Sequence, residues 1–221
     1  MVFIDAISQA YIANANAQNA EAMAKYMKNL FPFIGLKTDV RRALLKAELA
    51  NFKDEIKENP RQIALDLYGK KEREYHYTAI EILMKELKKN FIKEDITIIE
   101  KLLVSHSWWD SVDTISKYLL GSYLQQFPKE IPKVITRFSG SGNMWLNRSA
   151  ILFQLGYKKD TNVALLFSEC EKHRHSKEFF IQKAIGWALR EYAKTDASAI
   201  KQFVEIANLK PLSTREALKN I

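Results

Sequence analysis

Apolar residues recur along most of the chain at spacings of three and four positions, the period of an amphipathic α-helix. The stretch from 180 to 194 shows this period most clearly. Its apolar stripe consists of Ile181, Ala184, Ile185, Ala188, Leu189 and Tyr192. The pattern is interrupted where prolines or glycines end a helix, at Phe31-Pro32, Asn59-Pro60, Phe127-Pro128 and residues 139–142. We therefore expect an all-α protein with short connections.

Four aromatic residues open similar segments at nearly even intervals. They are Tyr75, Trp108, Trp145 and Phe180, and they are separated by 33, 37 and 35 residues. Helical pairs of this length stack into curved solenoids. We predict a single domain over residues 1–221, built as a right-handed α-solenoid of helical-pair repeats whose inner helices line a concave basic groove.

Trp187 does not belong to the apolar stripe of its predicted helix. It lies roughly 130° away from that stripe, on a face shared with Lys183, Arg190 and Lys194. The neighbouring Gly186 would let another backbone approach closely. An indole among three cations is typical of a nucleic-acid surface, where charge binds phosphates and the ring contacts sugar or base. Core packing is the usual alternative for a tryptophan, and the helical spacing argues against it here.

Two tryptophans and two carboxylates stand together at residues 107–113. In a helix, Trp108 would join Val112, Ile115 and Leu119 on a core-facing stripe. Trp109 and Asp113, four residues apart, would share a different face and could meet a ligand. Asp110 would lie on the far side, where we expect a solvated or capping role.

Aligning the repeats adds two cations to the predicted groove. Arg148 takes the position of Lys183, and Lys159 that of Lys194. The basic stripe should then recur on consecutive inner helices, with Trp109, Asp113, Arg148 and Trp187 at the centre of the groove.

Composition narrows the class of protein. The 221 residues are 47% hydrophobic, enough for a full core, and include only 7 Gly and 5 Pro. The single cysteine, Cys170, excludes an internal disulfide and is best interpreted as a small buried residue in a reducing compartment. No apolar run approaches a membrane span, and the first five residues lack the basic-then-apolar order of a signal peptide, so we expect a cytoplasmic monomer with no membrane partner.

The net charge of +8 is unevenly distributed. Residues 1–110 contain 17 Lys and Arg against 16 Asp and Glu, whereas residues 111–221 contain 17 against 10. Such an excess favours a polyanionic partner, although basic domains also carry charge for solubility.

Several chemistries find no support in the sequence. The four histidines do not form a metal set with cysteines, and the His173-Arg174-His175 turn suits phosphate better than zinc. Gly-rich dinucleotide or phosphate loops and a serine nucleophile elbow are absent. We therefore expect no metal, no cofactor and no nucleotide.

Long segments of the chain resemble the bacterial AlkD-type DNA glycosylases, a DNA alkylation repair family. The segments are SWWDSVD at 107–113, WLNRSAILFQL at 145–155 and SKEFFIQKAIGWALREYAK at 176–194, with further likeness at MAKYMKN (23–29) and Arg41-Arg42. The resemblance covers nearly the whole chain and implies HEAT-like helical repeats that bind duplex DNA.

The resemblance also implies roles for single residues. It makes Asp113 the catalytic carboxylate, and it places Trp109 and Trp187 around the deoxyribose of a damaged nucleotide. Arg148 would grip the nearby DNA backbone, and Tyr26 would lie near the lesion. The substrates implied are purines made cationic by alkylation at N3 or N7, recognised through sugar and backbone.

Elementary chemistry is compatible with those roles. Glycosidases usually use two carboxyl groups, but a cationic alkylpurine leaves as a neutral base without protonation. One carboxylate that stabilises an oxocarbenium-like state and positions water is then sufficient. Two alternatives stay open: a non-catalytic protein that binds damaged or structured DNA, and a protein-binding helical scaffold. The aromatic–carboxylate set argues against the first alternative, and the basic charge against the second.

Overall fold

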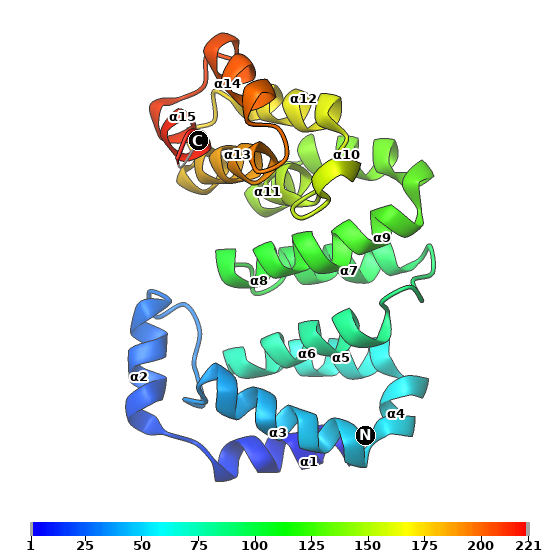
Figure 1. Ribbon diagram of the computed structural model, residues 1–221. Helices are drawn as coiled ribbons and strands as arrows, with labels where there is room; N and C mark the ends of the chain where they lie inside the picture. The colour runs from blue at the N-terminus through cyan, green and yellow to red at the C-terminus, as the bar shows by residue number, and fades with distance from the viewer. Residues whose placement is uncertain (1, 220–221) are drawn as a thin grey trace. The chain divides into compact units, whose positions relative to one another are not determined.

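A computed structural model describes residues 2–219 (Figure 1). Every regular element in that range is helical, so the all-α prediction is confirmed. Contacts between residues divide the chain into two compact units, one ending at Asn90 and the other beginning at Phe91. The single domain, the right-handed course and the concave basic groove concern the whole assembly and stay predictions.

The first unit contains six helices. They are α1 (Val2–Ala13), α2 (Ala17–Tyr26), α3 (Thr38–Asn51), α4 (Lys53–Glu58), α5 (Pro60–Tyr68) and α6 (Arg73–Glu86). The expected break at residues 59–60 is confirmed, because Pro60 occupies the first turn of α5 and Asn59 stands at its N-cap position, although its side chain makes no capping hydrogen bond.

The second unit contains the remaining elements. They are α7 (Asp95–Val104), α8 (Trp109–Thr114), η1 (Ile115–Leu120), α9 (Gly121–Gln126), η2 (Pro128–Glu130), α10 (Ile131–Ser139), α11 (Met144–Leu152), η3 (Lys158–Asp160), α12 (Val163–His173), α13 (Phe179–Ala193), α14 (Ala197–Ile206) and α15 (Pro211–Ala217).

In the first unit, α1, α3, α5 and α6 pack together, whereas α2 stands apart from them (Figure 1). Tyr11 of α1 stacks on Tyr75 of α6, and its hydroxyl lies 2.7 Å from that of Thr78. The segment before α3 is anchored by the buried carboxylate of Glu74, which accepts backbone N–H groups of residues 34–36. No residue of α2 is buried.

The second unit repeats a helical pair. α7 packs on η1, α10 on α11 and α12 on α13, and the second helices of successive pairs also contact each other. The helices α6, α8, α11 and α13 begin at residues 73, 109, 144 and 179, which are 36, 35 and 35 residues apart. The period expected from the aromatic spacing is therefore present in the structure.

One buried hydrophobic cluster of the second unit is formed mainly by α11, α12, α13 and α14. The predicted stripe of α13 is buried there, except that Tyr192 is only partly buried. Cys170 is fully buried in the same cluster, as expected, and burial raises the pKa of its thiol.

The helix that begins at Trp109 is not regular throughout. Its middle section, η1, is a π-helix, and α8, η1 and α9 follow one another without a break. At Gly121, just after η1, an added Cβ would lie 2.5 Å from the carbonyl oxygen of Phe153. The π-helical turn thus ends where the backbone of this helix packs directly against the backbone of the segment after α11.

None of the helices within residues 2–219 combines the length and the apolar character needed to cross a bilayer.

Candidate active site

The short helix α8 carries the two residues that sequence spacing placed on one face. Trp109 is its first residue, Asp113 follows one turn later, and both side chains are partly buried. On the adjacent face, Val112 is fully buried and holds the helix in place. The carboxylate therefore sits on a fixed scaffold at the edge of the core.

Asp113 is held by Arg148 of α11. Nε of Arg148 donates to Oδ1 of Asp113 at 2.7 Å, and Nη2 donates to Oδ2 at 2.9 Å. The side chain of Asp113 is 14% exposed and that of Arg148 is 5% exposed. Nη1 of Arg148 donates to the carbonyl oxygen of Phe180 in α13. This bidentate pair joins three helices and fixes the direction of the carboxylate.

Burial and the ion pair act on the carboxyl group in opposite directions. Burial raises the pKa of Asp113 above its ordinary value, and the negative charge of Asp110 adds to the rise. The two hydrogen bonds and the charge of Arg148 oppose it. The pKa of Asp113 lies above that of an exposed aspartate, because burial outweighs the stabilisation of the carboxylate by Arg148.

Three aromatic rings pack beside this pair and form what we call the aromatic cluster: Trp108, Trp145 and Phe180. Trp108 meets Trp145 at 5.8 Å and Phe180 at 5.1 Å between ring centroids. The expectation that Trp108 lies in the core on a helical stripe is wrong. The backbone of Trp108 is extended and caps α8, so its ring is half-buried in the cluster.

The expected basic stripe on α11 is also wrong. Arg148 is 4% exposed and paired with Asp113, because a buried guanidinium needs an anion. Lys159 does not lie on the same helix as Arg148, since α11 ends at Leu152 and Lys159 belongs to η3. Contact between Arg148 and a DNA phosphate stays a prediction.

Trp187 occupies the face of α13 predicted for it, but its side chain also contacts the hydrophobic core. Its ring is partly buried and packs against the cluster of buried residues in the second unit. The close approach expected at Gly186 is confirmed. A Cβ there would lie 2.4 Å from Cβ of Glu216 and 2.9 Å from the carbonyl oxygen of Ser213, both in α15.

The cations that flank Trp187 are already paired. Glu216 of α15 binds Nζ of Lys183 and Nη1 of Arg190, each at 2.9 Å. Lys194 pairs with Glu191 one turn before it, at 2.6 Å. The uncompensated basic face expected here is therefore wrong, because α15 places a carboxylate between two of its cations. DNA binding by these three residues stays a prediction.

Glu216 is the residue of this region that sequence reasoning missed. Its two cationic partners lower its pKa to about 2. Gly186 was the available signal, because it lies between Lys183 and Arg190 and permits another helix to approach closely. A helix that packs between two cations is expected to supply an acidic residue. The remaining predicted DNA contact, Tyr26, is 69% exposed at the end of α2 in the first unit.

The histidines do not approach one another with carboxylates as a metal site would require. Within the described part of the chain, no group of three His, Cys, Asp or Glu side chains could hold an ion. His173 instead bonds to the hydroxyl of Ser139 at 2.8 Å, which joins the end of α12 to the end of α10.

The arrangement suits stabilisation of a positive charge. An ionised carboxylate has about four acceptor positions, and Arg148 occupies two of those on Asp113. The others can face a reacting group at the exposed side, next to Trp109. A fixed anion beside an indole is the chemistry that a cationic transition state requires.

Comparison with known proteins places this geometry in a family. A family model described as DNA alkylation repair enzyme matches residues 7–221. A solved structure described as a predicted DNA alkylation repair enzyme from Enterococcus faecalis is 36% identical, with a TM-score of 0.85 over 94% of this chain and 96% of that one. No curated protein matches the chain.

Proposed function

Because the chain belongs to the family of DNA alkylation repair enzymes, we propose that it is a DNA glycosylase of the AlkD type. It would hydrolyse the N-glycosidic bond of positively charged N3- or N7-alkylated purines in duplex DNA. The observation that supports this most directly is Asp113: a single carboxylate, oriented by Arg148 and 14% exposed, one helical turn from Trp109.

In this mechanism the bond between C1′ and the alkylated base breaks as the base takes the bonding electrons and becomes neutral. Positive charge develops on the sugar, and Asp113 stabilises it electrostatically. A water molecule then adds to C1′, loses a proton to the solvent and yields an abasic site. No acid is needed for the leaving base, which agrees with a site that offers one well-oriented carboxylate.

The tryptophans would bind the sugar rather than the base. Trp109 shares its face of α8 with Asp113, and Trp187 lies two turns along α13 from Phe180, whose carbonyl anchors Arg148. Indole faces contact a sugar well and favour a developing cation. In this proposal Arg148 acts as a positioning residue, because its donors already hold Asp113 and Phe180.

Release of free base from duplex DNA containing 7-methylguanine tests the proposal. We expect release by the wild-type protein, and little or none from duplexes with the neutral lesions uracil or 1,N6-ethenoadenine. Efficient release of uracil would mean that a proton donor for the leaving base has been overlooked. Absence of release from 7-methylguanine DNA by folded protein would refute the glycosylase activity.

A non-catalytic DNA-binding protein is the second candidate, and the ion pair itself favours it. Arg148 already neutralises much of the charge on Asp113, and a structural ion pair of that kind needs no catalysis. The same assay separates the two: tight binding of 7-methylguanine DNA without release would support the non-catalytic protein.

A further inference from the structure

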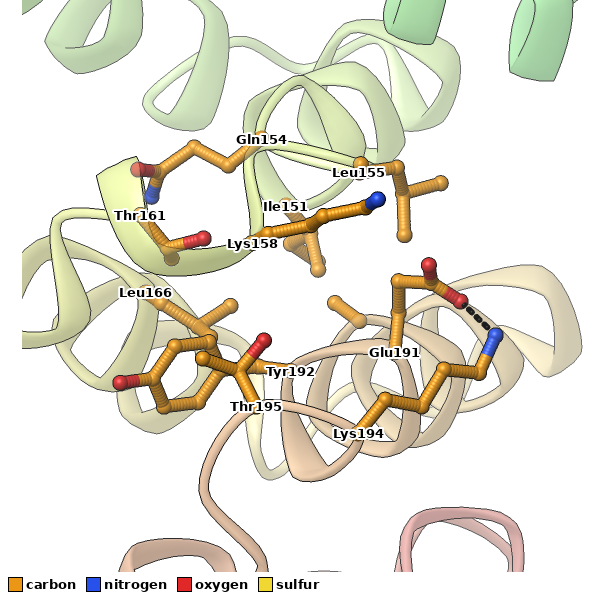
Figure 2. A pocket seen from close by; sticks show the side chains of 12 residues that line it. Ile151, Gln154, Leu155, Lys158, Thr161, Leu166, Glu191, Tyr192, Lys194 and Thr195 are labelled. Atoms are coloured by element: carbon orange, nitrogen blue, oxygen red, sulfur yellow. Dashed lines mark hydrogen bonds and ion pairs between the residues drawn. The ribbon is translucent and has the colours of Figure 1, made fainter.

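A pocket that neither Asp113 nor Arg148 lines opens between the C-terminal ends of α11 and α13 (Figure 2). Its volume is about 260 Å³. Apolar side chains of Ile151, Leu155, Leu166 and Ala188 form part of its lining. Polar groups complete it, and the ones that matter here are Lys158, Thr161, Glu191, Lys194 and Thr195.

The pocket continues a face already described. Glu191 and Lys194 follow Trp187 by four and seven residues on α13, so they lie on nearly the same side of the helix. At 1.5 Å per residue they are roughly 6–10 Å along the axis from Trp187. A DNA strand whose sugar contacts Trp187 could therefore reach this pocket with its neighbouring backbone.

Lys158 is held over the pocket by an unusual backbone. Its φ is +55°, in the left-handed region that disfavours residues with a side chain, and Gly156, two residues earlier, has a φ of +89°. Figure 2 shows the side chain of Lys158 running across the pocket with its amine toward Leu155. Strained conformations of this kind persist where the surroundings enforce them and often mark functional positions.

The polar groups have capacity for a ligand. Within residues 2–219, the ammonium of Lys158 and the hydroxyls of Thr161 and Thr195 make no hydrogen bond or ion pair to the protein. Lys194 pairs with Glu191, but its side chain is 69% exposed, and such surface pairs contribute little and exchange readily. The lining carries two cations and one anion, so a single negative charge balances it.

We propose that this pocket binds one phosphodiester of the DNA backbone next to the lesion, with the attached deoxyribose on the apolar floor. Lys158 and Lys194 would contact the phosphate oxygens, and the hydroxyls of Thr161 and Thr195 would donate hydrogen bonds to them. The apolar side chains match the carbon face of a sugar. This inference rests on the proposed function, because it assumes that DNA contacts Trp187.

The test compares two neighbouring lysines, of which Lys158 lines the pocket and Lys159 does not. Lys158→Gly removes the amine and also relieves the positive φ, so it should raise the thermal midpoint while weakening binding to undamaged duplex roughly fivefold to tenfold at 0.1 M salt. The slope of log affinity against log salt should fall by about 0.9. Lys159→Ala is the matched control, since Lys159 lies in the same turn but does not line the pocket. It should change both quantities less.

Neutral methylphosphonate linkages, placed one at a time near the lesion, identify the phosphate. One linkage should weaken binding of the wild-type protein clearly more than binding of the Lys158→Gly protein, in which Lys194 and the two hydroxyls are the only groups left to contact that phosphate. If every linkage affects both proteins alike, or if Lys159→Ala costs as much as Lys158→Gly, the pocket does not bind a phosphate.

The outcomes also separate this inference from the glycosylase activity. Base release without any linkage coupled to Lys158 overturns the pocket and leaves the activity intact. A coupled linkage without base release supports the pocket and refutes the activity.

Discussion

Replacing Asp113 by Asn removes the negative charge and keeps the shape of the side chain. If the carboxylate stabilises a cationic transition state, base release from 7-methylguanine DNA should fall by about 10²–10³, or about 2.7–4 kcal/mol, the effect of one well-placed electrostatic group. Affinity for undamaged duplex should stay within a few-fold, because Asp113 would act on the reacting sugar and contribute no attraction to phosphates.

The same substitution must affect stability, and the structure indicates how much. The side chain of Arg148, which is 5% exposed, would lose its anionic partner. The amide oxygen of Asn can still accept one hydrogen bond, so we expect a loss of about 1.5–3 kcal/mol, the range for hydrogen bonds to charged groups. For a chain of this size the midpoint should fall by roughly 5–10 °C, and the variant should stay folded at assay temperature.

Asp110→Asn is the control, because Asp110 lies on the same short helix and the bidentate pair with Arg148 is made by Asp113. It should keep full activity at neutral pH. If a folded Asp113→Asn protein releases base at the wild-type rate, Asp113 has no part in the mechanism. If Asp110→Asn loses as much activity as Asp113→Asn, the total negative charge of the helix matters more than the one carboxylate.

Three further changes are predicted. The rate of base release should rise with pH as Asp113 ionises, and this rise should lie at higher pH than for an ordinary aspartate, because burial raises the pKa of Asp113. The rate should then stay level through neutrality, and a fall there would reveal a catalytic acid. Arg148→Lys should shift that rise to higher pH by removing hydrogen bonds that lower the pKa of Asp113, and an unshifted profile would contradict the pairing as the cause. Gly186→Ala should destabilise the protein by about 1–3 kcal/mol in thermal unfolding, since its Cβ would lie 2.4 Å from Glu216. The control Gly142→Ala meets nothing within 4 Å and should stay within about 0.5 kcal/mol.

Acid stability offers a separate test of Glu216. Its pKa is about 2 in the folded protein, below that of an unfolded glutamate near 4.3. A lowered pKa stabilises the fold above the unfolded value, and that stabilisation is lost as pH falls from about 4.3 towards 2. Glu216→Gln should therefore flatten the loss of stability in this window, measured by denaturant unfolding at stepped pH. An equally steep loss in the variant would exclude the carboxylate as its source.

Local spacing predicted the local parts of the site. Trp109 and Asp113 lie one turn apart because residues four apart share a helical face, and Gly186 marks a close helix because a missing Cβ permits one. The start of a helix is less certain from periodicity, and Trp108 shows this. It continues the apolar stripe in the sequence but adopts an extended backbone one residue before α8.

Contacts between distant residues could not be predicted in the same way. Arg148 is 35 residues from Asp113, and Glu216 is 26 residues from Arg190. Such pairs depend on which helices pack together and at what rotation, and a charged residue gives the same sequence pattern whether it faces solvent or a buried partner. The basic stripe was overestimated for this reason.

The π-helical segment η1 limits how this protein can be redesigned. Asp113 and Gly121 are eight residues apart, which in a regular α-helix would separate their directions by roughly 80°, and the wider turn alters that rotation so that one meets Arg148 while the other meets Phe153. Deleting one residue from η1 would restore ordinary helical hydrogen bonds and leave circular dichroism nearly unchanged. It would also turn Asp113 relative to Gly121, so a more ideal helix would yield a less competent repair protein. Designs that make this helix regular would then lose the register that lets one helix bring Asp113 to Arg148 and Gly121 to Phe153.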